Sequence, residues 1–200
     1  MSLLGDFFAW VLDFDDEFDK ANTGALVNKQ SNIEPLPVIY GTRKIGGTRV
    51  FVSTGGGSNN EYLYMVLALC EGEIESIGDV YINEKLSTDS SYNNLVTIEK
   101  YTGTDDQTAT TLFADANDSW TSAHRLRGVA YLAVRIKYDR DTFTSIPEIE
   151  CIVNGKKVYD PRQDSTSTHY DSDVGVATQR ETDSTTWKSN TNPAICLMDY

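Results

Sequence analysis

The sequence predicts a mainly β protein (α+β) with one or two short helices. β-branched and aromatic runs alternate with polar turns over most of residues 35–162. No internal repeat, heptad or long helical period is present. The hydrophobic content of 40%, with eleven tyrosines, is enough for a core in 200 residues. We expect an N-terminal helix and arm (residues 1–34), a β-rich domain (35–162), and a polar linker with the start of a following helical segment (163–200).

The N-terminal arm predicts a short amphipathic helix within Met1–Phe14. Its apolar residues recur at helical spacing: Leu4, Phe7, Phe8, Val11 and Leu12. Asp6 and Asp13 interrupt the stretch, which is also shorter than the roughly 20 residues of a membrane span. It lacks the basic n-region of a signal peptide. We therefore expect this helix to dock onto the protein itself or onto a neighbour.

The β-rich domain begins with a predicted hairpin. Val38–Tyr40 and Thr48–Ser53 are strand-like, and a basic turn containing Gly46 and Gly47 separates them.

The next segment, Glu61–Cys70, is apolar on both alternating sets of positions, which is typical of a strand covered on two faces. A helix of similar length is the alternative, because periodicity does not separate the two for a short apolar run. The breaker at Thr54–Gly57 and the turn at Glu71-Gly72 favour the strand.

Three further strands are predicted between polar turns: Val80–Ile82, Leu95–Tyr101 and Gly128–Tyr138. Ile149–Tyr159 then predicts a second hairpin, since Asn154-Gly155 supplies two residues that tolerate positive φ between apolar arms. Pro161 ends it.

Residues 162–192 are rich in Ser, Thr, Asp and Asn and predict a linker or long surface loop. A helix is predicted to follow, with Asn192 as its N-cap and Pro193 at its first position. Because the given sequence ends at the second turn of this helix and would leave Ile195, Leu197 and Tyr200 poorly buried, we expect the polypeptide to continue beyond residue 200.

Charge and cysteine content argue against two classes of function, general nucleic-acid binding and cysteine-based metal or redox chemistry. The net charge of −13 argues against a general affinity for nucleic acid, which requires a surplus of Lys and Arg. Cys70, Cys151 and Cys196 are widely separated and flanked by apolar residues, so we expect small buried side chains rather than a disulfide or metal site.

No enzymatic motif is present. His124 and His169 have no partner at metal-ligand spacing, and Gly55–Gly57 lacks the Lys-Ser/Thr of a phosphate-binding loop. We expect no cofactor, no metal and no catalytic site.

Two acidic groups are candidate exceptions. Glu71, Glu73 and Glu75 could supply a glycosidase carboxylate only with a partner from elsewhere in the chain. Asp139, Asp141 and Asp160 could bind calcium but lack a DxDxDG loop.

Several phrases in the same order resemble the N-terminal part of the lambda-type tail-tip J proteins, the central hubs of long-tailed phages. They are PVIYGTRKIGGTRVFVST, NEYLYMVLALCEGEIESIGDVYIN, HRLRGVAYLAVRIKYD, IPEIECIVNGKKVYDPR and NPAICLMDY. Within them, ALCEGEI resembles the family's "seGpI" element and NPAICLMDY the first half of its "NPAxCLxDxLT…RYG" element. The resemblance covers most of Pro35–Arg162 and the last nine residues.

The resemblance implies a non-enzymatic virion protein at the tail tip, made in the host cytoplasm, with a hub domain of the tail-tube-like β-barrel or sandwich type. The implied assembly is a homotrimer that closes the tail tube and takes part in host attachment and DNA ejection. Its implied partners are the distal tail or tube ring, the tape-measure protein, viral DNA in transit, and the host envelope through a C-terminal region outside this sequence.

The residues of the matching phrases are candidates for assembly: Pro37, Tyr40, Gly41, Gly47, Glu71, Gly72, Asn154, Gly155, Pro161, Asn192 and Pro193. Acidic residues of the long polar loop are candidates for lining the channel: Asp105, Asp106, Asp115 and Asp118. A second candidate set is Asp164, Asp171 and Asp173. The alternative is that both loops face outward. Two other functions remain open, a tail-associated cell-wall glycosidase using Glu71 or Glu73, and a cytosolic β-domain with no viral link.

Overall fold

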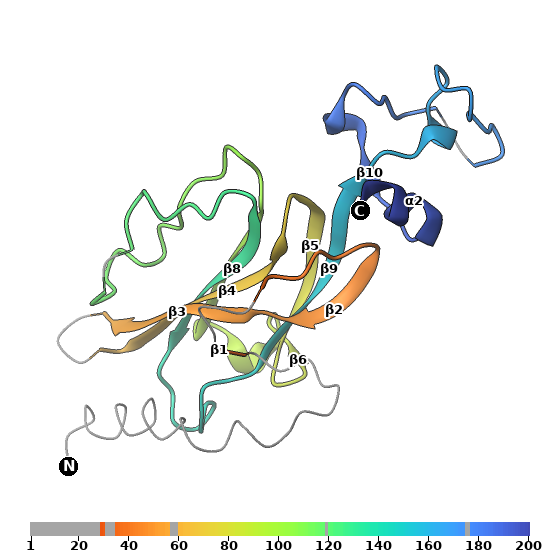
Figure 1. Cartoon of the computed structure of the whole chain (residues 1–200). Coiled ribbons are helices and arrows are strands. Elements are labelled where there is room, and N and C mark those ends of the chain that lie inside the picture. Colours follow the sequence, from red (N-terminus) through yellow and green to blue (C-terminus); the bar gives the residue numbers. More distant parts are fainter. Residues whose placement is uncertain (1–28, 31–34, 57–59, 119, 175–176) are drawn as a thin grey trace, which may run out of the picture.

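The chain folds into two β-sheets that share a hydrophobic core, which confirms the mainly β prediction (Figure 1). The computed structural model describes residues 29–30, 35–56, 60–118, 120–174 and 177–200. The predicted helix at Met1–Phe14 lies outside these ranges. Within them the two sheets stay separate, so the arrangement is a sandwich and not a closed barrel.

The first sheet has the strand order β1-β3-β4-β8-β7. Its strands are β1 (Lys29–Gln30), β3 (Thr48–Gly55), β4 (Tyr62–Glu71), β8 (Val129–Lys137) and β7 (Val96–Thr102). The β1–β3 pair is parallel and the other pairs are antiparallel.

The second sheet is organised around β9, which pairs with β5, β2 and β10. Its strands are β2 (Thr42–Gly46), β5 (Ile74–Ile82), β6 (Lys85–Leu86), β9 (Ile149–Val158) and β10 (Lys188–Ser189). A tight turn with positive φ at Asn83 and Glu84 joins β5 to β6.

The described helices are short. They are the single-turn 3-10 helices η3 (Ser90–Tyr92), η4 (Pro161–Gln163) and η5 (Ser184–Thr186), and helix α2 (Pro193–Asp199). None of the described helices is long and apolar enough to cross a membrane.

Strand β4 is buried on both faces, as its sequence predicts. Leu67 and its same-face neighbours pack into the core between the sheets. Tyr64 and Val66 pack on the opposite face with Phe113, which belongs to the loop of residues 103–128. This loop covers the outer face of the first sheet, so the strand interpretation of Glu61–Cys70 is confirmed over the helical one.

Gln107 ties the two ends of the 103–128 loop together. Its Oε1 accepts from the Gly103 amide at 3.0 Å, and its Nε2 donates to the carbonyl oxygens of Arg125 at 2.8 Å and Val129 at 3.2 Å. Gln107 is buried, so these hydrogen bonds replace the water that its amide would otherwise bind.

Cys70 and Cys151 are buried in the shared core and are free thiols, which confirms the prediction for these two. Burial raises the pKa of Cys70 to about 11 and that of Cys151 to about 12. Cys196 is free but only half-buried, and its Sγ donates to the carbonyl oxygen of Asn190.

The first predicted hairpin is wrong. The basic segment that was predicted to form its turn is itself strand β2, which pairs with β9, whereas β3 pairs with β4. Gly47 lies where the chain passes from one sheet to the other. A Cβ there would lie 2.9 Å from Leu67 Cβ, so the chain crosses against β4 only because position 47 has no side chain.

The second predicted hairpin is also wrong, because β9 runs straight through Asn154-Gly155. Asn154 is paired on both sides, with Thr42 of β2 and Ser76 of β5. Gly155 does not have a positive φ. Its amide donates to the carbonyl oxygen of Gly41 at 2.8 Å, within a close backbone contact.

Candidate assembly joint at the end of strand β9

Residues from three phrases far apart in the sequence meet where β9 ends, beside α2 (Figure 1). Gly155 lies against the 39–41 segment, and a Cβ on Gly41 would lie 3.1 Å from Thr191 Cγ2. Asn192 and Pro193 begin α2 close by, and Pro161 begins η4 just past the end of β9. We call this set the β9 joint; it comprises Tyr40, Gly41, Gly155, Lys156, Asn190, Asn192 and Asp199.

Helix α2 begins as the sequence predicts. Asn192 has extended backbone angles, and its Oδ1 accepts from the Ala194 amide at 3.0 Å. Pro193 occupies the first turn, where a missing N–H costs nothing. Asn190 stabilises the residues that lead into the helix, because its Oδ1 accepts a hydrogen bond from the Asn192 amide at 2.8 Å.

The other end of α2 is held by one carboxylate. Asp199 Oδ2 accepts from Tyr40 Oη at 2.7 Å and from Lys156 Nζ at 2.7 Å. Burial and the hydrogen bond to Asp199 raise the pKa of Tyr40 to about 12, so its hydroxyl remains a donor at physiological pH. The contact between Tyr40 and Asp199 joins residues 159 positions apart.

Asp160 stabilises the segment that follows β9. Its side chain is fully buried and accepts a two-pronged interaction from Arg162, with Nε at 2.9 Å and Nη2 at 2.7 Å. Asn190 Nδ2 donates to the same carboxylate at 3.0 Å. Burial alone would raise the pKa of Asp160, but the hydrogen bonds from Arg162 and Asn190 outweigh it and lower that pKa. The carboxylate thereby links η4 to the residue that positions α2.

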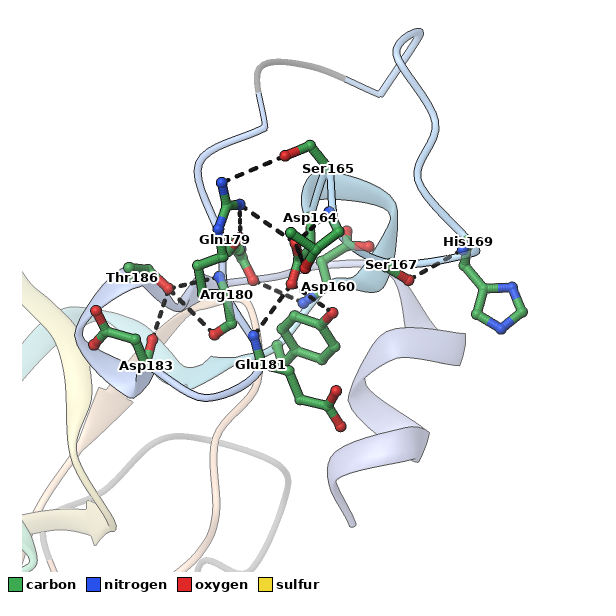
Figure 2. Close-up of polar contacts among 12 residues, drawn as sticks. Asp160, Asp164, Ser165, Ser167, His169, Gln179, Arg180, Glu181, Asp183 and Thr186 are labelled. Carbon is green, nitrogen blue, oxygen red and sulfur yellow. Dashed lines mark hydrogen bonds and ion pairs between the residues drawn. The ribbon is translucent and has the colours of Figure 1, made fainter.

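Asp164 organises the loop that follows, as Figure 2 shows. Its carboxylate accepts from the amide and hydroxyl of Thr166 at 2.8 and 2.7 Å, from Tyr159 Oη at 3.0 Å and from the Glu181 amide at 3.2 Å. Arg180 adds an ion pair at 3.3 Å. The hydrogen bonds from Thr166, followed by those from Tyr159 and Glu181, lower the pKa of Asp164 to about 2. The polar segment predicted as a linker or surface loop is therefore a loop built around a buried carboxylate.

Helix α2 and its C-cap residue Tyr200 present apolar side chains to solvent. Leu197, Met198 and Tyr200 are 74%, 67% and 93% exposed. Met198 lines a cleft together with Tyr159, Pro161 and Ser167.

The other assembly candidates lie elsewhere. Pro37, Glu71 and Gly72 meet at the turn between β4 and β5, where the Glu71 amide donates to the Pro37 carbonyl oxygen at 3.0 Å. Gly72 has φ +86, which confirms the predicted turn. Gly47 and Asn154 lie within or beside strands, as described above.

The channel-lining candidates separate into exposed and buried residues. Asp105, Asp106, Asp115 and Asp118 are exposed on the 103–128 loop, and Asp171 and Asp173 are also exposed. Asp164 is 1% exposed and satisfied by its own loop, so including it in the second set was wrong.

The acidic groups considered for chemistry do not converge. Glu73 pairs with Lys157, and Glu75 pairs with Lys188 and accepts from the Ser189 amide. Asp139 accepts from amides of its own turn, whereas Asp160 binds Arg162. In the part of the chain that the structure describes, no group of three or more His, Cys, Asp or Glu residues is placed to hold a metal ion.

Sequence reasoning missed Asp199, Lys156 and Asn190, although each is central to the joint. Their sequence contexts are ordinary for exposed residues. The Asp160-Pro-Arg162 spacing is the one local signal, since an Arg two residues after an Asp at the start of a short helix can reach back to it.

Comparisons with known proteins give partial matches to two proteins of virus-like particles. No family model matches the chain. It is 26% identical to the baseplate hub protein pb3 of Escherichia phage T5 over 181 residues, covering 62% of this chain and 19% of pb3. It shares a fold with a chain from the virion of a native gene transfer agent particle, with a TM-score of 0.52, 20% identity, and coverage of 90% of this chain and 42% of the other. The chain thus spans less than half of either relative, and these matches do not show the lambda-type family that the sequence resembles.

Proposed function

We propose that this chain is a structural virion protein that forms part of the hub of a phage tail tip or baseplate. The similarity to the T5 baseplate hub protein pb3 carries the proposal. The fold shared with a chain of the gene transfer agent virion supports it independently of that sequence match.

The finer proposal is a homotrimer that closes the tail tube, contacts the distal tail ring and the tape-measure protein, and opens for DNA passage. Host attachment is proposed for the whole hub rather than for these residues. A trimeric ring requires heterologous contacts, in which one surface of a subunit meets a different surface of the next. The exposed apolar side chains of α2 are one surface suited to such a contact.

No observation favours the glycosidase alternative. Hydrolysis of a glycosidic bond requires two carboxyl groups on either side of the substrate. Glu73 is in an ion pair with Lys157, and Glu71 ends β4 at an exposed turn. A zymogram on bacterial cell wall, run with the native chain and with Glu71→Gln, would reveal such an activity if it exists.

The test of the hub proposal is genetic and structural. The gene is deleted in the virus or element that carries it, and particles are examined by electron microscopy with and without complementation. We expect particles that lack tails or tail tips, restored by the native gene. The variant Gly78→Ala should restore them too, because an added Cβ there would lie 3.5 Å from its nearest neighbour, an ordinary contact. Gold labelling of a tagged, complementing chain should mark the tail tip. Normal tails in the deletion, or label absent from purified particles, would contradict the proposal.

A further inference from the structure

Two neighbouring arginines of the 103–128 loop, Arg125 and Arg127, form no ion pair with a carboxylate of the described residues. Arg125 Nε donates to the Ser122 carbonyl oxygen at 3.0 Å, which leaves its two terminal nitrogens available to a partner. Within the same ranges, several other cations do pair with carboxylates: Lys44, Lys156, Lys157, Arg162, Arg180 and Lys188. Because the chain has a net charge of −13, two adjacent cations without such a pair indicate a site that is free for another anion.

The backbone that carries these two side chains is held in place. Buried Gln107 donates from Nε2 to the carbonyl oxygens of Arg125 at 2.8 Å and Val129 at 3.2 Å. Between the two arginines, Leu126 has φ +49, a left-handed conformation that residues other than glycine rarely adopt. Such a conformation persists only where the surrounding contacts enforce it. The two arginines are therefore presented by a fixed turn.

Both arginines line one cleft on the surface, together with Ala123 and Leu126. A guanidinium can donate two parallel hydrogen bonds to a carboxylate, so two guanidiniums in one cleft fit a pair of carboxylates. DNA is a poorer match, because two cations on a chain of net charge −13 neutralise few phosphates. The cleft is therefore suited to an acidic segment of a protein.

Asp171 and Asp173 form the acidic pair that matches this cleft best. Both are exposed, and one residue separates them, as one residue separates the two arginines. The Asp173 amide donates to Asp171 Oδ1 at 2.9 Å, so the pair lies on an ordered turn. Neither aspartate forms an ion pair with a cation in the part of the chain that the structure describes. Asp139 and Asp141 have the same spacing, but Arg140 lies between them and offsets their charge.

We propose that the cleft of Arg125 and Arg127 binds the Asp171–Asp173 turn of a second copy of this chain. The 103–128 loop, in green, and the turn, in blue, lie at opposite ends of the molecule (Figure 1). The contact therefore joins two different surfaces, and repeating it head to tail can close a ring of copies. The inference rests on the proposed hub function and supplies one contact of its homotrimer. In this contact the two aspartates face a neighbouring copy instead of the DNA channel.

Charge reversal in the deletion strain tests the contact. The chain carrying Arg125→Glu with Arg127→Glu, or Asp171→Arg with Asp173→Arg, replaces the native gene. Each reversal places like charges against each other, so the fraction of particles with tail tips should fall by about tenfold or more. Both reversals combined in one chain restore opposite charges, and tail tips should return.

The matched control is Lys137→Glu with Arg140→Glu, which makes the same change of charge at two other exposed cations and should leave tail tips intact. Normal tail tips in both reversals would overturn the contact but not the hub proposal, which the deletion itself tests. A combined variant without tail tips would also overturn the contact. Normal tail tips with slowed DNA release in the arginine variant would overturn it as well, because the cleft would then act on phosphate.

Cross-linking keeps all four charges, and so covers the case in which a reversed variant folds poorly. Particles whose hub chain carries both Ala123→Cys and Ser172→Cys are treated with a short bis-maleimide and run on a denaturing gel. We expect covalent dimers and trimers from the double variant. Each single variant should give monomers, which controls for reaction at Cys196. Monomers alone from the double variant would overturn the contact.

Discussion

Gly155 and Ile39 lie in backbone contact, so close that a Cβ on Gly155 would lie 2.1 Å from the Ile39 carbonyl oxygen. The neighbouring Lys156 amide donates to that same oxygen at 2.7 Å. The clash would be with backbone held by a hydrogen bond rather than with a flexible side chain. Position 155 therefore requires glycine for space and not for turn geometry.

Replacing Gly155 with Val should destabilise the fold by about 1–3 kcal/mol, because an overpacked site forces the strand and the 39–41 segment apart. Urea unfolding measures the loss. The matched control is Gly78→Ala, where the nearest atom to an added Cβ is 3.5 Å away, an ordinary contact. Equal midpoints for Gly155→Val and Gly78→Ala would show that the contact is not as tight as described.

Most strand positions followed from the sequence because they depend on local composition, although Thr42–Gly46, expected to contain a turn, is strand β2, and Val38–Tyr40, expected to be a strand, is not one. The pairing of the strands did not follow from the sequence. Both incorrect hairpin predictions assumed that segments adjacent in sequence are hydrogen-bonded to each other in a sheet. Asn154-Gly155 has the same letters whether the glycine supplies a positive φ or space for Ile39. The helix start at Asn192 was predictable since a cap is local. The Tyr40–Asp199 contact was not, because nothing near either residue indicates a partner 159 positions away.

Replacing Gln107 with Glu should loosen the 103–128 loop. A carboxylate can still face the Gly103 amide but has no N–H to donate to the carbonyl oxygens of Arg125 and Val129. Leaving such buried groups unpaired costs about 1–3 kcal/mol. Thermal unfolding and proteolysis within the loop are the measurements. Asp106→Ser on the exposed part of the same loop is the control. Equal protease resistance of the two variants would show that the Gln107 hydrogen bonds do not hold the two ends of the loop together.

Stability should fall as the pH drops from about 4 towards 2. Asp164 has an ordinary pKa of 3.8 that the fold lowers to about 2, so its ionised form favours the folded state. This stabilisation is complete above the unfolded pKa and is lost as pH falls through the folded value. Asp160, whose pKa is also lowered, acts in the same direction.

The variant Asp164→Asn should be less stable than the native chain at pH 7, since an amide cannot accept all the donors of Thr166, Tyr159 and Arg180. Its stability should also change less between pH 4 and pH 2. Melting temperatures across that interval, with exposed Asp106→Asn as control, measure both effects. Parallel curves for Asp164→Asn and the native chain would refute the assignment.

Within the proposed hub, the exposed acidic side chains of the 103–128 loop are candidates for lining the DNA channel, against the alternative that the loop faces outward. The backbone of this loop is anchored independently of those charges, since the Asn117 amide donates to the Thr54 carbonyl oxygen and the Asp118 amide donates to Ser53 Oγ. Replacing Asp105, Asp106, Asp115 and Asp118 with Lys should therefore preserve assembly.

If these residues line the channel, DNA release on adsorption to host cells should slow, because Lys attracts phosphate within a Debye length of about 8 Å at physiological salt. Higher salt should relieve the defect, and the matching Asn variants should release DNA at nearly the native rate. The same reversal at Asp171 and Asp173 examines the second loop. Native release kinetics in particles that carry the Lys variants would assign that loop to the outside of the tip.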